Sequence, residues 1–311
     1  LCVMLMLVSM TACGAADDGK YVIGICQQMT HPALDAATQG FKDALIAQLG
    51  EENLTFKAQD AGGEQVNCTT IMDGFVAENV DLILANATWP LQAAASATST
   101  IPVLGTSITD YATALNITDW NGTVGGNISG TSDLAPLDQQ AAMIKELFPD
   151  TETVGLLFCS AEPNSVYQVE QMKAYLEDMG YTCAEFAFTD VNDLASVTQT
   201  ACDGSDVIYI PTDNTAAAYS ETIANEVIPA KVPVIAGEEG ICAGCGVATL
   251  TISYYDIGFA TGLMAFEILE NGADIAAMPI EYAPQFVKKY NPANIEALGL
   301  PVPEGYVAIG A

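Results

Sequence analysis

Polar residues that could hold a small ligand follow several apolar segments of this chain. Each group stands directly before a segment whose apolar residues recur at helical spacing. The first turn of a helix has free backbone N–H groups that favour an anion, and a neighbouring carboxylate favours a cation. Helix capping would explain any one of these turns, but several of them together predict a shared binding site. The candidate ligand-binding residues are Gln28, His31, Thr88, Trp89, Ser107, Asp110, Glu162, Asn164, Ser165, Asp213, Asn214 and Glu239.

The chemistry of these turns suits a ligand that carries both charges. Helix starts at Thr88 and Ser165 offer N–H groups to a carboxylate, and Asp213 and Glu239 offer carboxylates to an ammonium group. A buried charge without a partner is costly, so each end of a zwitterion must be matched. The pattern therefore favours an amino acid. A sugar or a nucleoside is the alternative, although a sugar site would have to work without arginine because basic residues are so scarce.

Apolar strands that alternate with amphipathic helices position these turns. This repetition predicts a parallel sheet covered by helices, and in such sheets ligands bind outside the carboxyl ends of the strands. In the first half of the chain we expect strands over residues 21–26, 54–59, 81–86 and 102–107, with helices between them.

Residues 116–133 interrupt the alternation with Gly, Asn and Thr, which we interpret as a loop that crosses between two lobes. The alternation then resumes up to residue 270. The predicted fold class is α/β, with two doubly wound parallel-sheet lobes joined by a multi-crossing hinge. Residues 20–131 with 253–279 are assigned to the N-terminal lobe, and residues 132–252 with 280–311 to the C-terminal lobe.

The N-terminal segment predicts where the protein works. Residues 1–8 form an apolar run typical of the central region of a signal peptide, and small residues then precede Cys13. We interpret residues 1–13 as a signal-peptide remnant with a lipobox, Cys13 as the lipidation site and residues 14–19 as a tether. An ordinary cleaved signal peptide or a buried strand is the alternative. The expected location is extracytoplasmic, with a lipid anchor in the outer face of the cell membrane.

Charge and cysteine usage exclude other classes of protein. The chain has 39 acidic and 8 basic residues and a net charge of -31, so no nucleic-acid partner is expected. Cys242 and Cys245 form a single CxxC pair, and the one histidine, His31, is far away in sequence. We therefore expect structural thiols or one local disulfide there, no metal site and no cofactor.

Several motifs resemble the ABC-transporter substrate-binding lipoprotein family, which includes tryptophan- and tyrosine-binding members. They occur in family order from about residue 20 to residue 290. The motifs are Ile23–Gln27, His31–Ala37 with Gly40-Phe41, Asp81–Ala85, Ala87-Thr88, Gly126–Gly130, Glu162–Ser165, Pro211–Asn214 and Tyr254–Gly258. The resemblance implies a type I periplasmic-binding fold, no catalysis, and delivery of the ligand to a permease with an ATPase.

The resemblance also implies a role for each candidate residue. Thr88 and the helix start after it would hold the carboxylate of the ligand, with Asn164 and Ser165 from the other lobe. Asp213 would pair with the ammonium group, with Asn214 and Glu239 nearby, and His31 and Gln28 would line the side-chain end. The chain departs from the family pattern at Trp89, which could stack on an aromatic ligand or fill part of the pocket, and at Tyr111.

The resulting hypothesis is a solute-binding lipoprotein of an ABC importer that closes on an amino acid, with an aromatic one favoured. A binding module of a sensor or receptor would have the same lobes. An enzyme is the rival from another class, because Asp213, Glu238 and Glu239 could act as acids or bases. The chain has neither a G-x-S-x-G elbow nor a P-loop, so we do not expect catalysis.

Overall fold

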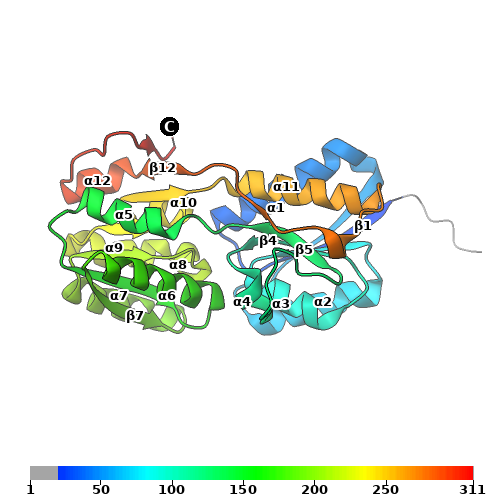
Figure 1. The fold of residues 1–311 in the computed structure, drawn as a ribbon, viewed down its shortest axis with the longest axis horizontal. Coiled ribbons are helices and arrows are strands. Elements are labelled where there is room, and N and C mark those ends of the chain that lie inside the picture. The colour runs from blue at the N-terminus through cyan, green and yellow to red at the C-terminus, as the bar shows by residue number, and fades with distance from the viewer. Residues whose placement is uncertain (1–19, 311) are drawn as a thin grey trace, which may run out of the picture.

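The computed structural model describes residues 20–310 and contains two sheets, each the centre of its own lobe (Figure 1). The predictions for the signal peptide, Cys13 and the tether lie outside the described residues. Within residues 20–310, no helix combines the length and the apolar character needed to cross a membrane.

The first lobe is built on a parallel sheet of six strands in the order β11-β5-β4-β3-β1-β2. Helices cover both of its faces (Figure 1). The strands are β1 (Tyr21–Gln27), β2 (Leu54–Asp60), β3 (Leu82–Asn86), β4 (Val103–Ile108), β5 (Ile128–Ser132) and β11 (Glu281–Tyr282). The helices are α1 (Pro32–Leu49), α2 (Gln65–Glu78), α3 (Thr88–Ala97), α4 (Tyr111–Leu115) and α11 (Tyr254–Leu269), with short 3-10 turns at Glu51–Asn53 and Ile275–Ala277.

The second lobe is built on a sheet of seven strands in the order β13-β12-β10-β9-β8-β6-β7. Its pairings are parallel except for β10 with β12. The strands are β6 (Thr153–Cys159), β7 (Thr182–Phe188), β8 (Val207–Ile210), β9 (Val234–Ala236), β10 (Ala248–Thr251), β12 (Val287–Tyr290) and β13 (Val307–Ala308). The helices are α5 (Leu137–Leu147), α6 (Pro163–Asp178), α7 (Val191–Gly204), α8 (Asn214–Ala218), α9 (Ser220–Ala230), α10 (Glu239–Gly244) and α12 (Pro292–Leu298). The predicted class, two α/β lobes with parallel sheets, is confirmed.

The chain passes between the lobes at residues 133–136, 252–253 and 283–286. The last passage follows β11, which pairs with β5 in the first sheet, just beyond the predicted end of the N-terminal lobe at residue 279. The residue-level boundaries of the lobes otherwise stay a proposal. Three passages of the chain therefore join the two lobes, which is the multi-crossing connection that the sequence predicted.

The interpretation of residues 116–133 as a loop was wrong at its end, because residues 128–132 form β5. This strand is buried along its whole length. Its residues Ser129, Gly130 and Thr131 are small or polar, so the sequence lacks the apolar pattern by which a buried strand is recognised. Small residues are required there: a Cβ on Gly130 would lie 2.1 Å from the carbonyl oxygen of Gly105. The hydroxyl of Thr131 is paired with that of Thr261 on α11 at 2.8 Å, so β5 is buried through a polar contact.

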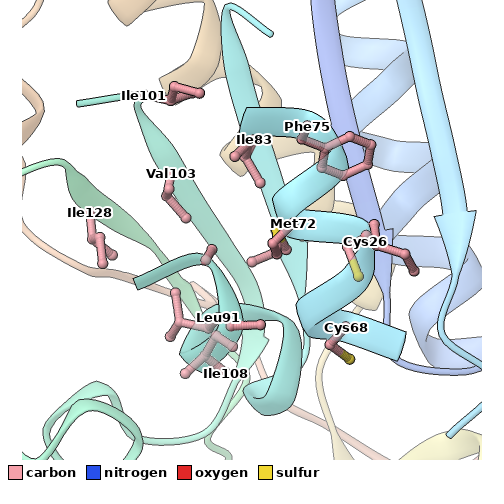
Figure 2. Close-up of a cluster of buried hydrophobic side chains, with 14 of the residues drawn as sticks. Cys26, Cys68, Met72, Phe75, Ile83, Leu91, Ile101, Val103, Ile108 and Ile128 are labelled. Atoms are coloured by element: carbon pink, nitrogen blue, oxygen red, sulfur yellow. The ribbon is translucent and has the colours of Figure 1, made fainter. Parts of the chain in front are cut away.

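The core of the first lobe shows why α2 and α3 pack on this sheet. Met72 and Phe75 of α2 and Leu91 of α3 lie against Ile83 and Val103 of the sheet (Figure 2). Two buried cysteines belong to the same cluster, Cys26 on β1 and Cys68 on α2. The seven cysteines in the described part of the chain, including Cys242 and Cys245, are free thiols. Burial raises the pKa of the Cys242 and Cys245 thiols, so both behave as small apolar side chains.

Candidate functional site

A small cavity lies between the lobes at the carboxyl ends of their strands, which is where an α/β sheet places its ligand. The first lobe contributes six residues to its wall, and the second lobe another six. The lining residues are His31, Leu34, Ser107, Thr109, Asp133 and Tyr254, and Asn164, Thr212, Asp213, Asn214, Ala217 and Glu238. The cavity leaves about 10 Å³ for the centre of a water-sized molecule, which is room for about one water. The lobes must therefore separate to admit a metabolite.

Direct contacts hold the lobes together around this cavity. His31 Nε2 lies 3.2 Å from Asn214 Oδ1, and Gln168 Nε2 of α6 donates to Thr109 Oγ1 at 3.3 Å. Ala218 of α8 packs on an apolar group of the first lobe formed by Met29, Leu34 and Ala87. These contacts describe two lobes that are closed on each other.

Several polar atoms around the cavity are buried and lack a hydrogen-bond partner within residues 20–310. They are His31 Nδ1, Ser107 Oγ, Asn164 Oδ1 and Gln28 Nε2. Gln28 follows β1 and lies beside the start of α3. A buried polar atom without a partner costs about 1–3 kcal/mol, so the four atoms near the cavity are candidates to bond a ligand. Ser107 also has a left-handed backbone, with φ of 56°, and strain of this kind is typical of functional sites.

Three of the nearby carboxylates are engaged by helix N-termini of the second lobe. Glu162 accepts from the backbone N–H groups of Asn214 and Thr215 at 3.1 and 2.9 Å, and also from both of their side chains. Asp213 accepts from Ala216 N at 2.8 Å and from Cys159 N at 2.7 Å. Glu238 accepts from the first N–H groups of α10. These contacts tie the carboxylates to the fold.

Asp133 differs from these three because hydroxyl groups hold it. Thr109 Oγ1 donates to Asp133 Oδ1 at 3.1 Å, and the Tyr254 hydroxyl donates to Oδ2 at 2.9 Å. The residue follows β5 and begins the first passage between the lobes. Burial raises the pKa of its carboxyl to about 6, and the bonds from Tyr254 and Thr109 oppose this rise.

The cavity is acidic. Burial raises the pKa of Glu238 to about 7 and, with the charge of Glu162, raises that of Asp213. Burial lowers the pKa of His31, although its bond to Asn214 opposes this, so the imidazole is neutral at pH 7. The eight basic residues of the chain are all lysines, and within residues 20–310 no lysine lines the cavity.

The structure brings most of the predicted site residues together. His31, Ser107, Asn164, Asp213 and Asn214 line the cavity. Glu162 and Ser165 are buried directly behind Asn164, since its Nδ2 lies 3.3 Å from a carboxylate oxygen of Glu162 and from Ser165 Oγ. Thr88 is the buried first residue of α3, and Gln28 Oε1 accepts from the N–H of Trp89 in the same turn at 3.2 Å.

Trp89, Asp110 and Glu239 point elsewhere. The Trp89 side chain packs on the core beneath α2 and α3 and borders a surface depression with Val66 and Gln92. Asp110 caps α4 by accepting from Thr113 N at 2.7 Å. Glu239 forms an ion pair with Lys289 at 2.6 Å, in an adjoining cleft of about 430 Å³ that α1, α10 and β12 border. Glu238 and Tyr254 line both this cleft and the cavity.

Sequence reasoning missed Thr109, Asp133, Thr212 and Tyr254. Thr109 and Thr212 stand beside residues that were chosen, so neighbourhood could have found them. Asp133 could have been found only by recognising β5, since it is the polar residue that follows that strand. Tyr254 begins α11 after the second passage between the lobes, and no local pattern points its hydroxyl to the cavity.

Comparisons with known proteins match nearly the whole chain. A family model described as ABC transporter substrate binding protein matches residues 22–309. A tyrosine-binding protein of Clostridioides difficile is 31% identical over 260 residues, which cover 83% of this chain and 75% of that protein. A solved domain from Streptococcus pneumonia in complex with L-Trp is 32% identical, covers 93% of this chain and 100% of its own, and has a TM-score of 0.88.

A further solved structure differs mainly in shape. It is the ligand-free, open form of a substrate-binding protein with adhesive properties from Clostridium difficile. It is also 32% identical and covers 93% of this chain and 99% of its own, but its TM-score is 0.71. At equal identity, the lobes described here are thus arranged more like those of the chain that holds a ligand.

Proposed function

The chain belongs to the ABC transporter substrate-binding protein family, and from this premise we propose that it captures a zwitterionic amino acid between its lobes for an ABC importer. The ligand is an aromatic amino acid such as tryptophan or tyrosine. The protein binds and releases this ligand without chemical change.

The observation that carries the proposal is the set of buried polar atoms without partners around the cavity between the lobes. His31 Nδ1 and Ser107 Oγ come from the first lobe, and Asn164 Oδ1 comes from the second. A ligand that bonds to all three contacts both lobes at once, and it therefore stabilises lobes that are drawn together around it. Binding is favoured further because the ligand removes the cost of leaving these buried atoms without hydrogen bonds.

The charges around the cavity support a zwitterion. The acidic wall favours an ammonium group, and no lysine of residues 20–310 borders the cavity to hold the carboxylate. Helix N-termini can supply that contact: α3 and α6 begin at Thr88 and Pro163 without a hydrogen bond from the side chain of their own N-cap residue. The N–H groups of Thr88 and Asn164 at these helix starts, together with the positive dipole ends, favour an anion. Pro163 has no N–H, and that of Trp89 is bonded to Gln28.

Two relatives support an aromatic side chain. One is named for tyrosine binding, and the other was solved with L-Trp. Trp89 packs on the core, so the contact with the ligand ring would come instead from Leu34, Ala217 and Tyr254 on the cavity wall. The cavity is much smaller than the roughly 300 Å³ of an ordinary ligand pocket, so lobes that hold this ligand must stand further apart than in the arrangement described here.

The proposed role places the protein outside the cytoplasm, held at the outer face of the membrane by lipid on Cys13. Its partners are then a permease and an ATPase of the ABC type. Deletion of the gene should abolish high-affinity uptake of the ligand, whereas a sensor or receptor module would leave uptake unchanged.

A binding screen tests the ligand class. Thermal shift and calorimetry with the twenty amino acids, a set of sugars and a set of nucleosides should identify an aromatic amino acid that binds at micromolar concentration or tighter, about −8 kcal/mol. At a hundred times its dissociation constant it should add about 2.7 kcal/mol of stability. A shift only with a sugar or nucleoside would overturn the amino-acid assignment, and conversion of the ligand during incubation would overturn the binding-protein role.

A further inference from the structure

We propose that Asp133, at the start of a passage between the lobes, accepts hydrogen bonds from the ammonium group of the ligand. Through this contact the protein selects ligands that carry an ammonium group. This inference rests on the proposed function, since it assigns a residue to that ligand. It departs from the role that the family resemblance implies for Asp213.

The first reason is that helix N-termini already offset the negative charge of the other acidic groups near the cavity. Asp213 accepts one backbone N–H on each oxygen, from Ala216 and Cys159. Glu238 is held on both oxygens by the start of α10. Glu162 accepts from backbone and side-chain donors of the α8 start and does not line the cavity. A carboxylate that satisfies a helix N-terminus has its negative charge already offset by that dipole.

The second reason is the geometry of Asp133 itself. It lines the cavity and is 5% exposed, and its two donors are the hydroxyls of Thr109 and Tyr254, at 3.1 and 2.9 Å. An ionised carboxylate has about four acceptor sites, so two such bonds leave capacity for the N–H groups of an ammonium ion. Both hydroxyls hold the carboxylate in place without contributing a formal charge.

The charge on Asp133 suits this role. Although burial raises the pKa of its carboxyl to about 6, the group is ionised at neutral pH. Tyr254, Tyr111 and Glu238 lie close enough to interact with it electrostatically. A cation placed at Asp133 would relieve the cost of burying this charge, and a neutral ligand would not.

The position of Asp133 links recognition to closure. It begins the passage between β5 and α5, and its partner Tyr254 begins α11 directly after the passage at residues 252–253. Thr109, its other partner, accepts the bond from Gln168 of the second lobe. An ammonium group at Asp133 thus lies where two passages of the hinge meet and beside a direct bond between the lobes. A ligand without that group leaves a buried carboxylate unpaired when the lobes close.

The test uses Asp133→Asn and pairs of ligands that differ only in the ammonium group. The pairs are tyrosine with 3-(4-hydroxyphenyl)propionate and tryptophan with indole-3-propionate. The wild-type protein should prefer the amino acid of each pair by about a hundredfold or more, as for a buried charge pair that loses one partner. Asp133→Asn should lose most of that preference by weakening the amino acid. Asn can donate to and accept from hydroxyl groups, so the variant should keep its fold, which circular dichroism checks.

Two other variants make the result specific. Asp73→Asn removes the same charge from the exposed face of α2 and should leave the preference intact. Asp213→Asn tests the rival carboxylate: a preference lost there and retained in Asp133→Asn would overturn the assignment. If the wild-type protein binds no amino acid, the proposed function fails and this inference with it. If it binds one and Asp133→Asn keeps the full preference, only the role of Asp133 fails.

Discussion

The acidic residues around the cavity have different roles, and their hydrogen bonds show which of them cap helices. The sequence predicted Asp213 for the ammonium group because it follows an apolar segment and precedes a helix. Those are also the properties of an N-cap, and Asp213 caps α8. Residue type and position predicted which turns meet at the cavity. They could not predict which side chains face the cavity, because two residues that are adjacent in sequence can point in different directions. Glu238 lies on the cavity wall, whereas the next residue, Glu239, forms an ion pair with Lys289.

The buried carboxyls predict an unusual dependence of stability on pH. The pKa of Asp133 is raised to about 6 and that of Glu238 to about 7, above their unfolded values of 3.8 and 4.5. Between pH 5 and 7 the folded protein retains protons that the unfolded chain releases, so stability falls as pH rises. His31, with its lowered pKa, opposes this below about pH 6.5, but the carboxyls outnumber it.

Melting of the ligand-free protein checks this prediction. The free energy of unfolding should decrease by at least about 2 kcal/mol from pH 5 to pH 7, since one pKa unit corresponds to about 1.4 kcal/mol. Asp213, whose pKa is also raised, adds to this decrease. Glu238→Gln removes one of the titrating groups and should flatten the profile. A stability that rises over the same interval would contradict the raised pKa values.

At the scale of elements, the strands and helices with clear periodicity were predictable, and the elements that pack through small residues were not. β1 and α1 have apolar residues at the expected spacing, and they occur close to their predicted bounds. β5 was missed because its buried side chains are small and polar. The requirement for Gly130 there comes from the neighbouring strand, which a single segment of sequence does not contain.

The close packing of α1 on α11 gives a sharp test. A Cβ on Gly258 would lie 2.0 Å from the carbonyl oxygen of Ala37, and one on Gly40 would lie 2.1 Å from that of Tyr255. Gly258→Ala should therefore cost about 1–3 kcal/mol through overpacking. Gly74→Ala in α2 is the matched control, because a Cβ there meets nothing within 4 Å; it should stabilise by up to about 1 kcal/mol. Equal melting temperatures for the two variants would refute the close contact.

At the scale of the whole molecule, the repeated α/β units predicted two lobes, and the net negative charge predicted that the protein would not bind nucleic acid. The net charge of -31 is spread over exposed carboxylates, and the described lysines that form ion pairs do so at exposed or half-buried positions. Such pairs contribute little, so mutual repulsion should dominate the electrostatic energy of the surface.

Added salt should therefore stabilise the protein. Raising sodium chloride from ~20 to ~200 mM shortens the screening length and should raise the free energy of unfolding by roughly 1 kcal/mol. The effect should vanish near the isoelectric point of about 4.1. Destabilisation by salt at pH 7 would mean that the surface ion pairs outweigh the repulsion.

The first lobe is assembled from distant parts of the chain, and this constrains how the protein can be made. α11 covers the face of the first sheet on which Phe41 and Leu45 of α1 also pack, and β11 extends that sheet beside β5. A nascent chain that has emerged only as far as β10 still exposes part of this apolar face. Synthesis of residues 254–282 is thus the step that allows the lobe to close its core, and until then the exposed apolar face makes the polypeptide prone to aggregation.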